Sequence, residues 1–251
     1  MSPGPQIRVG VGGWVFPPWR GVFYPPGLPQ ARELGHASRL LTTIEINGTF
    51  YGPQKPASFH RWHDETPDDF VFSLKGPRVA THRSDLAGAG PVFERFIASG
   101  IAELRDKLGP ILWQFPPNMP IDEGALAAFL ELLPREIGGR ALRHAVEFRR
   151  SGAATAPVIE LLRRNKVALV VVDDARRDFE ITAEFGYFHL RRCADDEPEG
   201  YPPGALDAWA QRLREQSAQA ACDCFVYFIS GAKIRAPAAA RALIQRLTPA
   251  A

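Results

Sequence analysis

Short apolar runs recur along the chain, and several of them end in a charged or amide side chain. Because side chains alternate between the two faces of a strand, the bulky apolar residues of such a run share one face and the polar residues share the other. The pattern predicts a sheet with an apolar outer face and polar groups near the strand ends of its inner face. Eight strands are expected, at residues 7–13, 43–48, 70–75, 110–115, 144–149, 167–173, 186–191 and 224–229.

Apolar residues at helical spacing predict helices between most of these strands. The expected helices cover residues 57–65, 92–108, a segment that starts at Asp122, 157–165, 205–216 and 237–247. Parallel strands need long crossovers, so eight strands alternating with helices over 251 residues predict one α/β domain, residues 1–251. The predicted fold is a single (β/α)8 TIM-like barrel, irregular around strands six to eight, where the link at 174–185 is short and charged.

A doubly wound open sheet is the alternative fold. Such a sheet usually carries a glycine-rich phosphate turn after its first strand, and the run from Gly10 to Trp14 does not have the GxGxxG spacing.

Composition narrows the class of protein. The chain is 45% hydrophobic and 23% charged with a net charge of +2, which is ordinary for a folded domain and does not by itself indicate nucleic acid. We expect no secretory signal and no membrane span, because no window is apolar enough for either. Three cysteines, an odd number, fit a reducing cytoplasm better than a disulfide framework, so a cytoplasmic location is expected.

The candidate catalytic residues are carboxylates and one histidine near the ends of different strands. In a TIM barrel such positions meet at one end, which carries the active site. Several acids in one place can divide general acid and base roles if their environments separate their pKa values. The alternative is a salt-bridged polar layer without catalysis. The predicted catalytic residues are Glu45, Glu147, Asp173 and His189.

Cations are expected at the same end, so an anionic ligand with a phosphate or a carboxylate fits best. Aromatic residues in the loops could stack on a ligand or could simply pack on one another. The predicted substrate-binding residues are Trp14, Asn47, Tyr51, Lys75, Gln114, Arg149, Arg191 and Tyr227. No cofactor is expected. A metal bound by Glu45, Glu147, Asp173 and His189 is a minority hypothesis, because the interleaved cations oppose a divalent ion.

The chain also resembles a known family in several long motifs. They are Gly12-Gly13-Trp14, Trp19 to Pro25, Glu45 to Tyr51, Phe72 to Arg78, Leu108 to Pro117 and Ala145 to Arg149. They are similar to the YecE-like family, a domain of unknown function. The resemblance implies a TIM-like barrel and does not imply any particular activity.

Two late segments depart from that family's pattern. His189-Leu190-Arg191-Arg192 reverses the usual order of histidine and arginine, and Tyr227-Phe228-Ile229-Ser230 lacks a usual pair of asparagines. A tryptophan expected shortly after Arg149 is also missing. These departures suggest a ligand specificity different from that of relatives, or a reduced activity.

The leading hypothesis is an enzyme that acts by acid–base chemistry on a small anionic substrate, with Glu45 and Glu147 as the acid–base pair. One alternative is a binding protein without catalysis, for nucleic acid or a phosphorylated metabolite; the other is a divalent-metal hydrolase or isomerase. Substrate, reaction type and oligomeric state do not follow from the sequence.

Overall fold

Within the residues that the computed structural model describes, 4–173 and 180–248, eight parallel strands close into a barrel. The barrel strands are β1 (Ile7–Gly12), β2 (Thr43–Ile46), β3 (Val71–Lys75), β4 (Leu108–Phe115), β7 (His144–Phe148), β8 (Ala168–Val172), β9 (Phe185–Leu190) and β10 (Asp223–Phe228). Each strand pairs with the barrel strand before and after it in the sequence, and β10 closes the ring on β1. The predicted strands and the predicted TIM barrel are confirmed.

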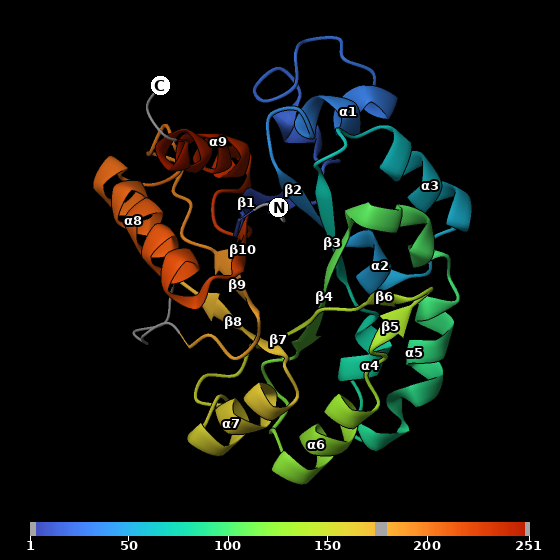
Figure 1. Cartoon of the computed structure of the whole chain (residues 1–251). Coiled ribbons are helices and arrows are strands. Elements are labelled where there is room, and N and C mark those ends of the chain that lie inside the picture. The colour runs from blue at the N-terminus through green and yellow to red at the C-terminus, as the bar shows by residue number, and fades with distance from the viewer. Residues whose placement is uncertain (1–3, 174–179, 249–251) are drawn as a thin grey trace.

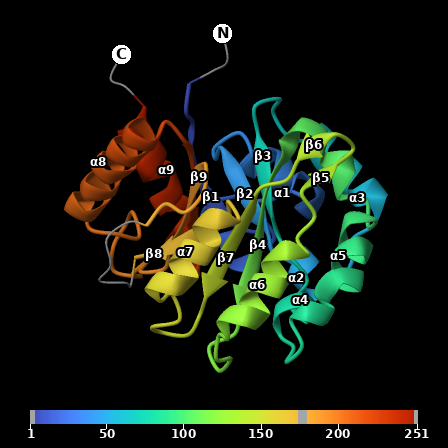
Figure 2. The same ribbon diagram turned by 60° about the horizontal axis from the view of Figure 1, so that its bottom comes forward.

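Helices surround this barrel (Figures 1 and 2). The α-helices are α1 (Glu33–Ala37), α2 (Gly48–Tyr51), α3 (Pro56–Asp64), α4 (Arg78–Thr81), α5 (Gly90–Ile97), α6 (Glu123–Glu131), α7 (Ala156–Arg164), α8 (Pro203–Ala220) and α9 (Ala236–Leu247). Short 3-10 helices are η1 (Pro17–Trp19), η2 (Gln30–Arg32), η3 (Ala87–Ala89), η4 (Ile101–Lys107) and η5 (Lys233–Arg235). A two-stranded hairpin, β5 (Glu136–Ile137) and β6 (Arg140–Ala141), lies outside the barrel.

The single helix predicted for residues 92–108 is wrong. The chain forms α5, breaks, and continues as the 3-10 helix η4. The break falls at Gly100, whose φ of 99° belongs to the left-handed region that ends helices and favours glycine.

The other predicted helices are confirmed with shifted ends. Asp122 caps α6 by accepting a hydrogen bond from the Ala125 amide at 2.8 Å, as its position before the helix predicts. The link expected to be irregular, 174–185, lies partly outside the described residues; its described part, 180–184, contains no helix or strand. In the described part of the chain no helix has both the length and the apolar character of a membrane span.

The barrel wall separates two apolar clusters. Residues that point outward pack under the helices, and Trp113 and Phe129 belong to that outer core. Residues that point inward form a smaller cluster that includes Val71, Leu112 and Tyr187. Towards the carboxyl ends of the strands, the inward positions become polar, so one end of the barrel interior carries charged side chains.

Candidate active site

The carboxyl ends of the barrel strands, called the mouth below, carry a group of buried ionisable side chains. Glu45 comes from β2, Glu147 from β7 and His189 from β9, and their exposed fractions are 0%, 1% and 0%. Each lies on the inward face of its strand: Glu147, for example, is level with Gln114 of the neighbouring β4. Three of the predicted catalytic residues therefore come together.

His189 is held by Glu45 at one ring nitrogen. Its Nε2 lies 2.8 Å from Oε2 of Glu45, and the Tyr187 hydroxyl donates a hydrogen bond to the same oxygen at 2.7 Å. Burial alone would raise the pKa of Glu45. The nearby charge and hydrogen bond of His189, the charge of Lys75 and the hydrogen bond from Tyr187 outweigh burial and lower the pKa to about 2. Glu45 is therefore a carboxylate that stays ionised.

The other nitrogen of His189 faces the second carboxylate. Nδ1 lies 3.4 Å from Oε2 of Glu147, and the same carboxylate pairs with the Arg191 guanidinium and accepts a hydrogen bond from the Gln114 amide. Only an imidazolium has N–H groups on both nitrogens and can donate towards both carboxylates. Glu45, His189 and Glu147 thus form a continuous buried line, called the relay below.

One carboxylate oxygen of Glu45 lacks a hydrogen-bond partner in the part of the chain that the structure describes. Oε1 of Glu45 is buried and accepts no hydrogen bond from the described residues, although Oε2 of the same carboxylate accepts two. A buried carboxylate oxygen that lacks a donor costs free energy, so its presence is a feature that needs explanation.

Lys75 lies close to the relay without an ion pair of its own. Within the described part of the chain its Nζ forms no hydrogen bond and no salt bridge, and it lies 4.7 Å from the centroid of the Phe50 ring. Burial lowers the pKa of Lys75, while the charges of Glu45 and Tyr51 raise it and those of Arg149 and Arg191 lower it again. The charges of Arg149 and Arg191 are thus close enough to act on Lys75. Arg149 is exposed, and it too forms no ion pair with a described residue.

Asp173 has a different surrounding. Its carboxylate accepts hydrogen bonds from the backbone amides of Arg191, at 2.8 Å, and Arg192, at 3.2 Å, and from the Tyr201 hydroxyl. These contacts fix the backbone that carries Arg191. Asp173 therefore contacts the backbone next to the relay in these hydrogen bonds.

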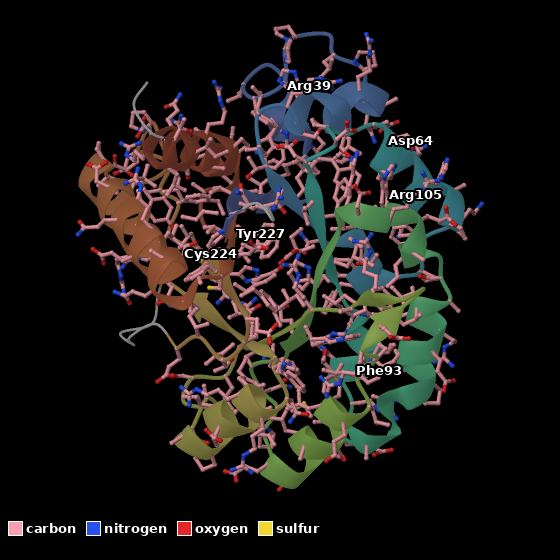
Figure 3. All side chains as sticks on the ribbon, in the orientation of Figure 1. Arg39, Asp64, Phe93, Arg105, Cys224 and Tyr227 are labelled. Carbon is pink, nitrogen blue, oxygen red and sulfur yellow. The ribbon has the colours of Figure 1, made fainter. Side chains whose placement is uncertain are left out.

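Tyr227 also lies in the barrel interior, on β10, in register with His189 of β9. Tyr227, labelled in Figure 3, is fully buried. Its hydroxyl contacts Thr43 at 2.9 Å and also contacts Ser73. Burial raises the pKa of Tyr227 above its usual range. Its polar atom is satisfied by the protein.

The remaining predicted binding residues lie at the edge of the mouth or outside it. Tyr51 is 76% exposed. Asn47 lies over Gly12, where an added Cβ would come within 2.8 Å of its amide nitrogen. Trp14 packs on Trp62 of α3 with ring centroids 5.1 Å apart, on the outer side of the barrel wall. The mouth therefore brings together most of the predicted set, and Trp14 lies apart from it.

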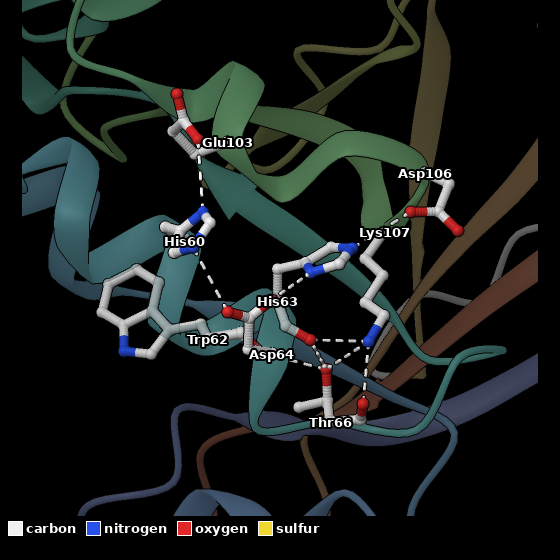
Figure 4. Close-up of polar contacts among 8 residues, drawn as sticks. All are labelled: His60, Trp62, His63, Asp64, Thr66, Glu103, Asp106 and Lys107. Atoms are coloured by element: carbon white, nitrogen blue, oxygen red, sulfur yellow. Dashed lines mark hydrogen bonds and ion pairs between the residues drawn. The ribbon is translucent and has the colours of Figure 1, made fainter.

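A second polar cluster lies on α3 and η4, away from the mouth (Figure 4). His60 lies within 3.4 Å of acidic oxygens of Asp64 and Glu103, and His63 within 3.3 Å of Asp64 and Asp106. In the same view the Lys107 ammonium donates to carbonyl oxygens of neighbouring residues. No group of three or more potential ligands among the described residues is arranged to hold a metal ion.

Tyr187 and Tyr201 contact Glu45 and Asp173, and neither tyrosine was predicted from the sequence as a site residue. Tyr187 is two residues before His189 and therefore shares its inward face, so strand alternation was a usable signal. Tyr201 lies in the loop before α8, and no periodic pattern places a loop residue against Asp173.

The fold and the mouth together describe a (β/α)8 barrel with a buried carboxylate–imidazole–carboxylate line at the carboxyl ends of its strands. The family described as "Protein of unknown function DUF72" matches residues 8–251. The chain belongs to this family, and the resemblance noted from its motifs is confirmed.

Relatives with known sequences and structures agree with this assignment. The chain is 28% identical over 170 residues to the UPF0759 protein YecE of Escherichia coli K12, an alignment that covers 67% of this chain and 59% of YecE. The chain thus spans less than two thirds of that relative's length. A DUF72 family protein from Thermotoga maritima superposes with a TM-score of 0.77 at 25% identity, over 96% of this chain and 99% of that protein. One from Enterococcus faecalis gives a TM-score of 0.75 at 16% identity, over 98% and 97% of the two chains.

Proposed function

We propose that the chain is an enzyme that transfers protons to and from a small, polar, anionic substrate at the mouth. The observation that carries the proposal is the relay itself. Two carboxylates and an imidazole from three different strands are buried in contact with one another, and this arrangement exceeds what packing of the barrel requires.

The geometry suggests distinct roles for the two carboxylates. Glu45 stays ionised and holds one nitrogen of His189, so it orients the ring and stabilises its charged form. Nδ1 of His189 forms no hydrogen bond with a described residue, which leaves it available to exchange a proton with Glu147 or with a substrate atom. In this proposal His189 and Glu147 move the proton and Glu45 is the orienting residue.

The cations of the mouth suit a substrate that carries or develops negative charge. Arg191 is paired with Glu147, whereas Lys75 and Arg149 have no acidic partner among the described residues. Fixed positive charges near the reacting atoms stabilise an anionic ground state and an oxyanion in the transition state. Asp173 supports this set by holding the backbone at Arg191.

Proton exchange with solvent tests the proposal without knowledge of the full reaction. We would incubate the protein in D2O with sugar phosphates, hydroxy acids and dicarboxylates and follow deuterium incorporation and product formation by NMR. We expect incorporation into one chemical class, and a loss of 10²-fold or more in the His189→Gln and Glu147→Gln variants.

The matched control is His144→Gln, a buried histidine on the outer side of the barrel wall. This variant is expected to keep full activity. Equal rates in wild type and in the two relay variants would contradict the proposal, and so would the absence of any exchange or turnover across the tested classes.

A further inference from the structure

The mouth has two layers of charge, one above the other. On three strands an inward residue of the relay level is followed, two residues later, by a cation. A spacing of two residues moves roughly 7 Å along a strand, so the cations form a layer nearer to solvent than the acids. The pairs are Ser73 and Lys75 on β3, Glu147 and Arg149 at the end of β7, and His189 and Arg191 at the end of β9.

The layer of cations nearer to solvent, called the outer layer, contains positive charges that are not paired with acidic groups of the described residues; the layer of acids beneath it is called the inner layer. Lys75 contacts a ring face instead of a carboxylate, and the exposed Arg149 has no ion pair with a described residue. Lys75 and Arg149 are close enough to interact electrostatically. Burial lowers the pKa of Lys75, the charge of Glu45 raises it, and the charge of Arg149 lowers it. A partly buried ammonium without a counter-ion is a place for an anion.

In the inner layer, one carboxylate oxygen has no hydrogen-bond donor among the described residues. This oxygen is the buried Oε1 of Glu45, whereas Tyr187 and His189 both contact Oε2 of the same carboxylate. Because the carboxylate stays ionised, it can only accept a hydrogen bond. The group that satisfies Oε1 must therefore carry a hydrogen, such as a hydroxyl, and must be free of negative charge.

The geometry points to a ligand with two features: an anionic group that binds Lys75 and Arg149 in the outer layer, and a hydroxyl group that donates to Oε1 of Glu45 in the inner layer. This inference rests on the proposed function, since it names the substrate class of the same site. The class is small hydroxylated phosphates or carboxylates, in which the anion and the hydroxyl are separated by a few bonds, comparable with the spacing of the two layers.

Three matched probes separate the two features. Glycerol 3-phosphate has the anion and the hydroxyls, n-propyl phosphate has only the anion, and glycerol has only the hydroxyls. We expect calorimetry on the whole chain to show that glycerol 3-phosphate binds about tenfold or more tightly than either of the other two. Glycerate, with a carboxylate in place of the phosphate, shows which anion the outer layer prefers, and binding of either anion with a hydroxyl preference supports the inference.

Two variants assign the features to residues. Lys75→Met should weaken both phosphates by about tenfold and leave glycerol unchanged. Glu45→Gln should remove the preference for glycerol 3-phosphate over n-propyl phosphate, because the amide oxygen stays with Tyr187 and His189 and its NH2 group replaces the acceptor.

Equal binding of the two phosphates, or no binding of any probe at millimolar concentration, would overturn the inference. Its failure is distinguishable from failure of the proposed function. Selective binding without proton exchange would support the ligand class and contradict the proposed enzymatic activity. Proton exchange on an uncharged substrate would support the activity and contradict the ligand class.

Discussion

His144 and His189 are both buried histidines of barrel strands, and they lie on opposite sides of the barrel wall. His144 points outward, where its Nδ1 accepts a hydrogen bond from the Trp113 indole at 3.1 Å and its Nε2 contacts the Pro134 carbonyl at 2.6 Å. His189 points inward and lies between two carboxylates. Both ring nitrogens of His144 therefore have neutral hydrogen-bond partners, whereas the ring of His189 lies between two carboxylates.

Two lysines show the same contrast. Lys107 is buried and its ammonium donates to the carbonyl oxygens of His63, at 2.6 Å, and Thr66, at 2.7 Å, and to the Thr66 hydroxyl at 3.2 Å (Figure 4). Lys75 has no such acceptors within the described part of the chain. Buried polar groups of this barrel therefore fall into two kinds. A group whose hydrogen bonds are all made within the protein indicates a structural residue, and a buried charged group with incomplete pairing indicates a ligand-binding site.

The largest expected effect comes from making the same substitution at the two histidines. His189→Leu leaves two buried carboxylates without the imidazole and should lower the free energy of unfolding by about 3–5 kcal/mol. His144→Leu leaves an indole N–H and a carbonyl unpaired and should cost about 1–3 kcal/mol. Urea denaturation at neutral pH measures both.

A second substitution provides the control. Glu45→Gln removes one of the two charges that His189 faces, so it should restore part of the stability in the His189→Leu background and none in the His144→Leu background. Equal losses in the two leucine variants, or additive effects of Glu45→Gln in both backgrounds, would show that the two histidines have the same role.

Smaller effects are expected for the two lysines: one substitution should change stability and the other should change ligand binding. Lys107→Met removes three hydrogen bonds to a charged group, and it should lower the unfolding free energy by about 1.5–3 kcal/mol while ligand binding stays intact. Lys75→Met loses no hydrogen bond to a described residue, so its free energy of unfolding should stay within about 0.5 kcal/mol of wild type while phosphate binding weakens by about tenfold.

Urea denaturation and calorimetry with glycerol 3-phosphate check both lysine variants. If Lys75→Met destabilises the protein as much as Lys107→Met, Lys75 is a structural residue and the outer layer of charge loses its main member.

Strand alternation explains why much of this contrast is readable from the sequence. The inward positions of Glu45, Glu147 and His189 follow from the parity of apolar neighbours, and so does the position of Lys75. Parity ends where a strand ends: Trp14 is two residues beyond Gly12, but the chain turns at Gly13, with a φ of 74°, and the indole lies outside the wall.

Pairing between distant segments is not readable in this way. Asp173 and Tyr201 meet through a loop whose path no periodicity describes, and the break at Gly100 divides an apolar pattern that continues on both sides. Which oxygen of Glu45 lacks a partner depends on side-chain geometry at the level of single ångströms, which a sequence pattern does not contain.

A pH dependence of stability separates two of the buried groups, His144 and Glu45. Burial is the largest cause that lowers the pKa of His144, to about 4 from 6.5, with the charge of Arg135 acting in the same direction and the hydrogen bond to Pro134 opposing it. The unfolded chain therefore takes up this proton first. The stability that the neutral ring provides is complete above pH 6.5 and is lost as the pH falls towards 4, by at most about 1.4 kcal/mol per pH unit.

Glu45 acts in a lower window. Its folded pKa of about 2 lies below the 4.5 of an unperturbed carboxyl, so its contribution is complete above pH 4.5 and is lost as the pH falls towards 2. Unfolding free energies of wild type, His144→Gln and Glu45→Gln between pH 7 and pH 3 resolve the two, because each variant subtracts one group. If the stability of His144→Gln changed with pH in parallel with wild type between pH 6.5 and 4, His144 would not be held neutral in the folded protein. The contrast between fully paired residues outside the barrel wall and incompletely paired residues at the mouth would then lose its main support.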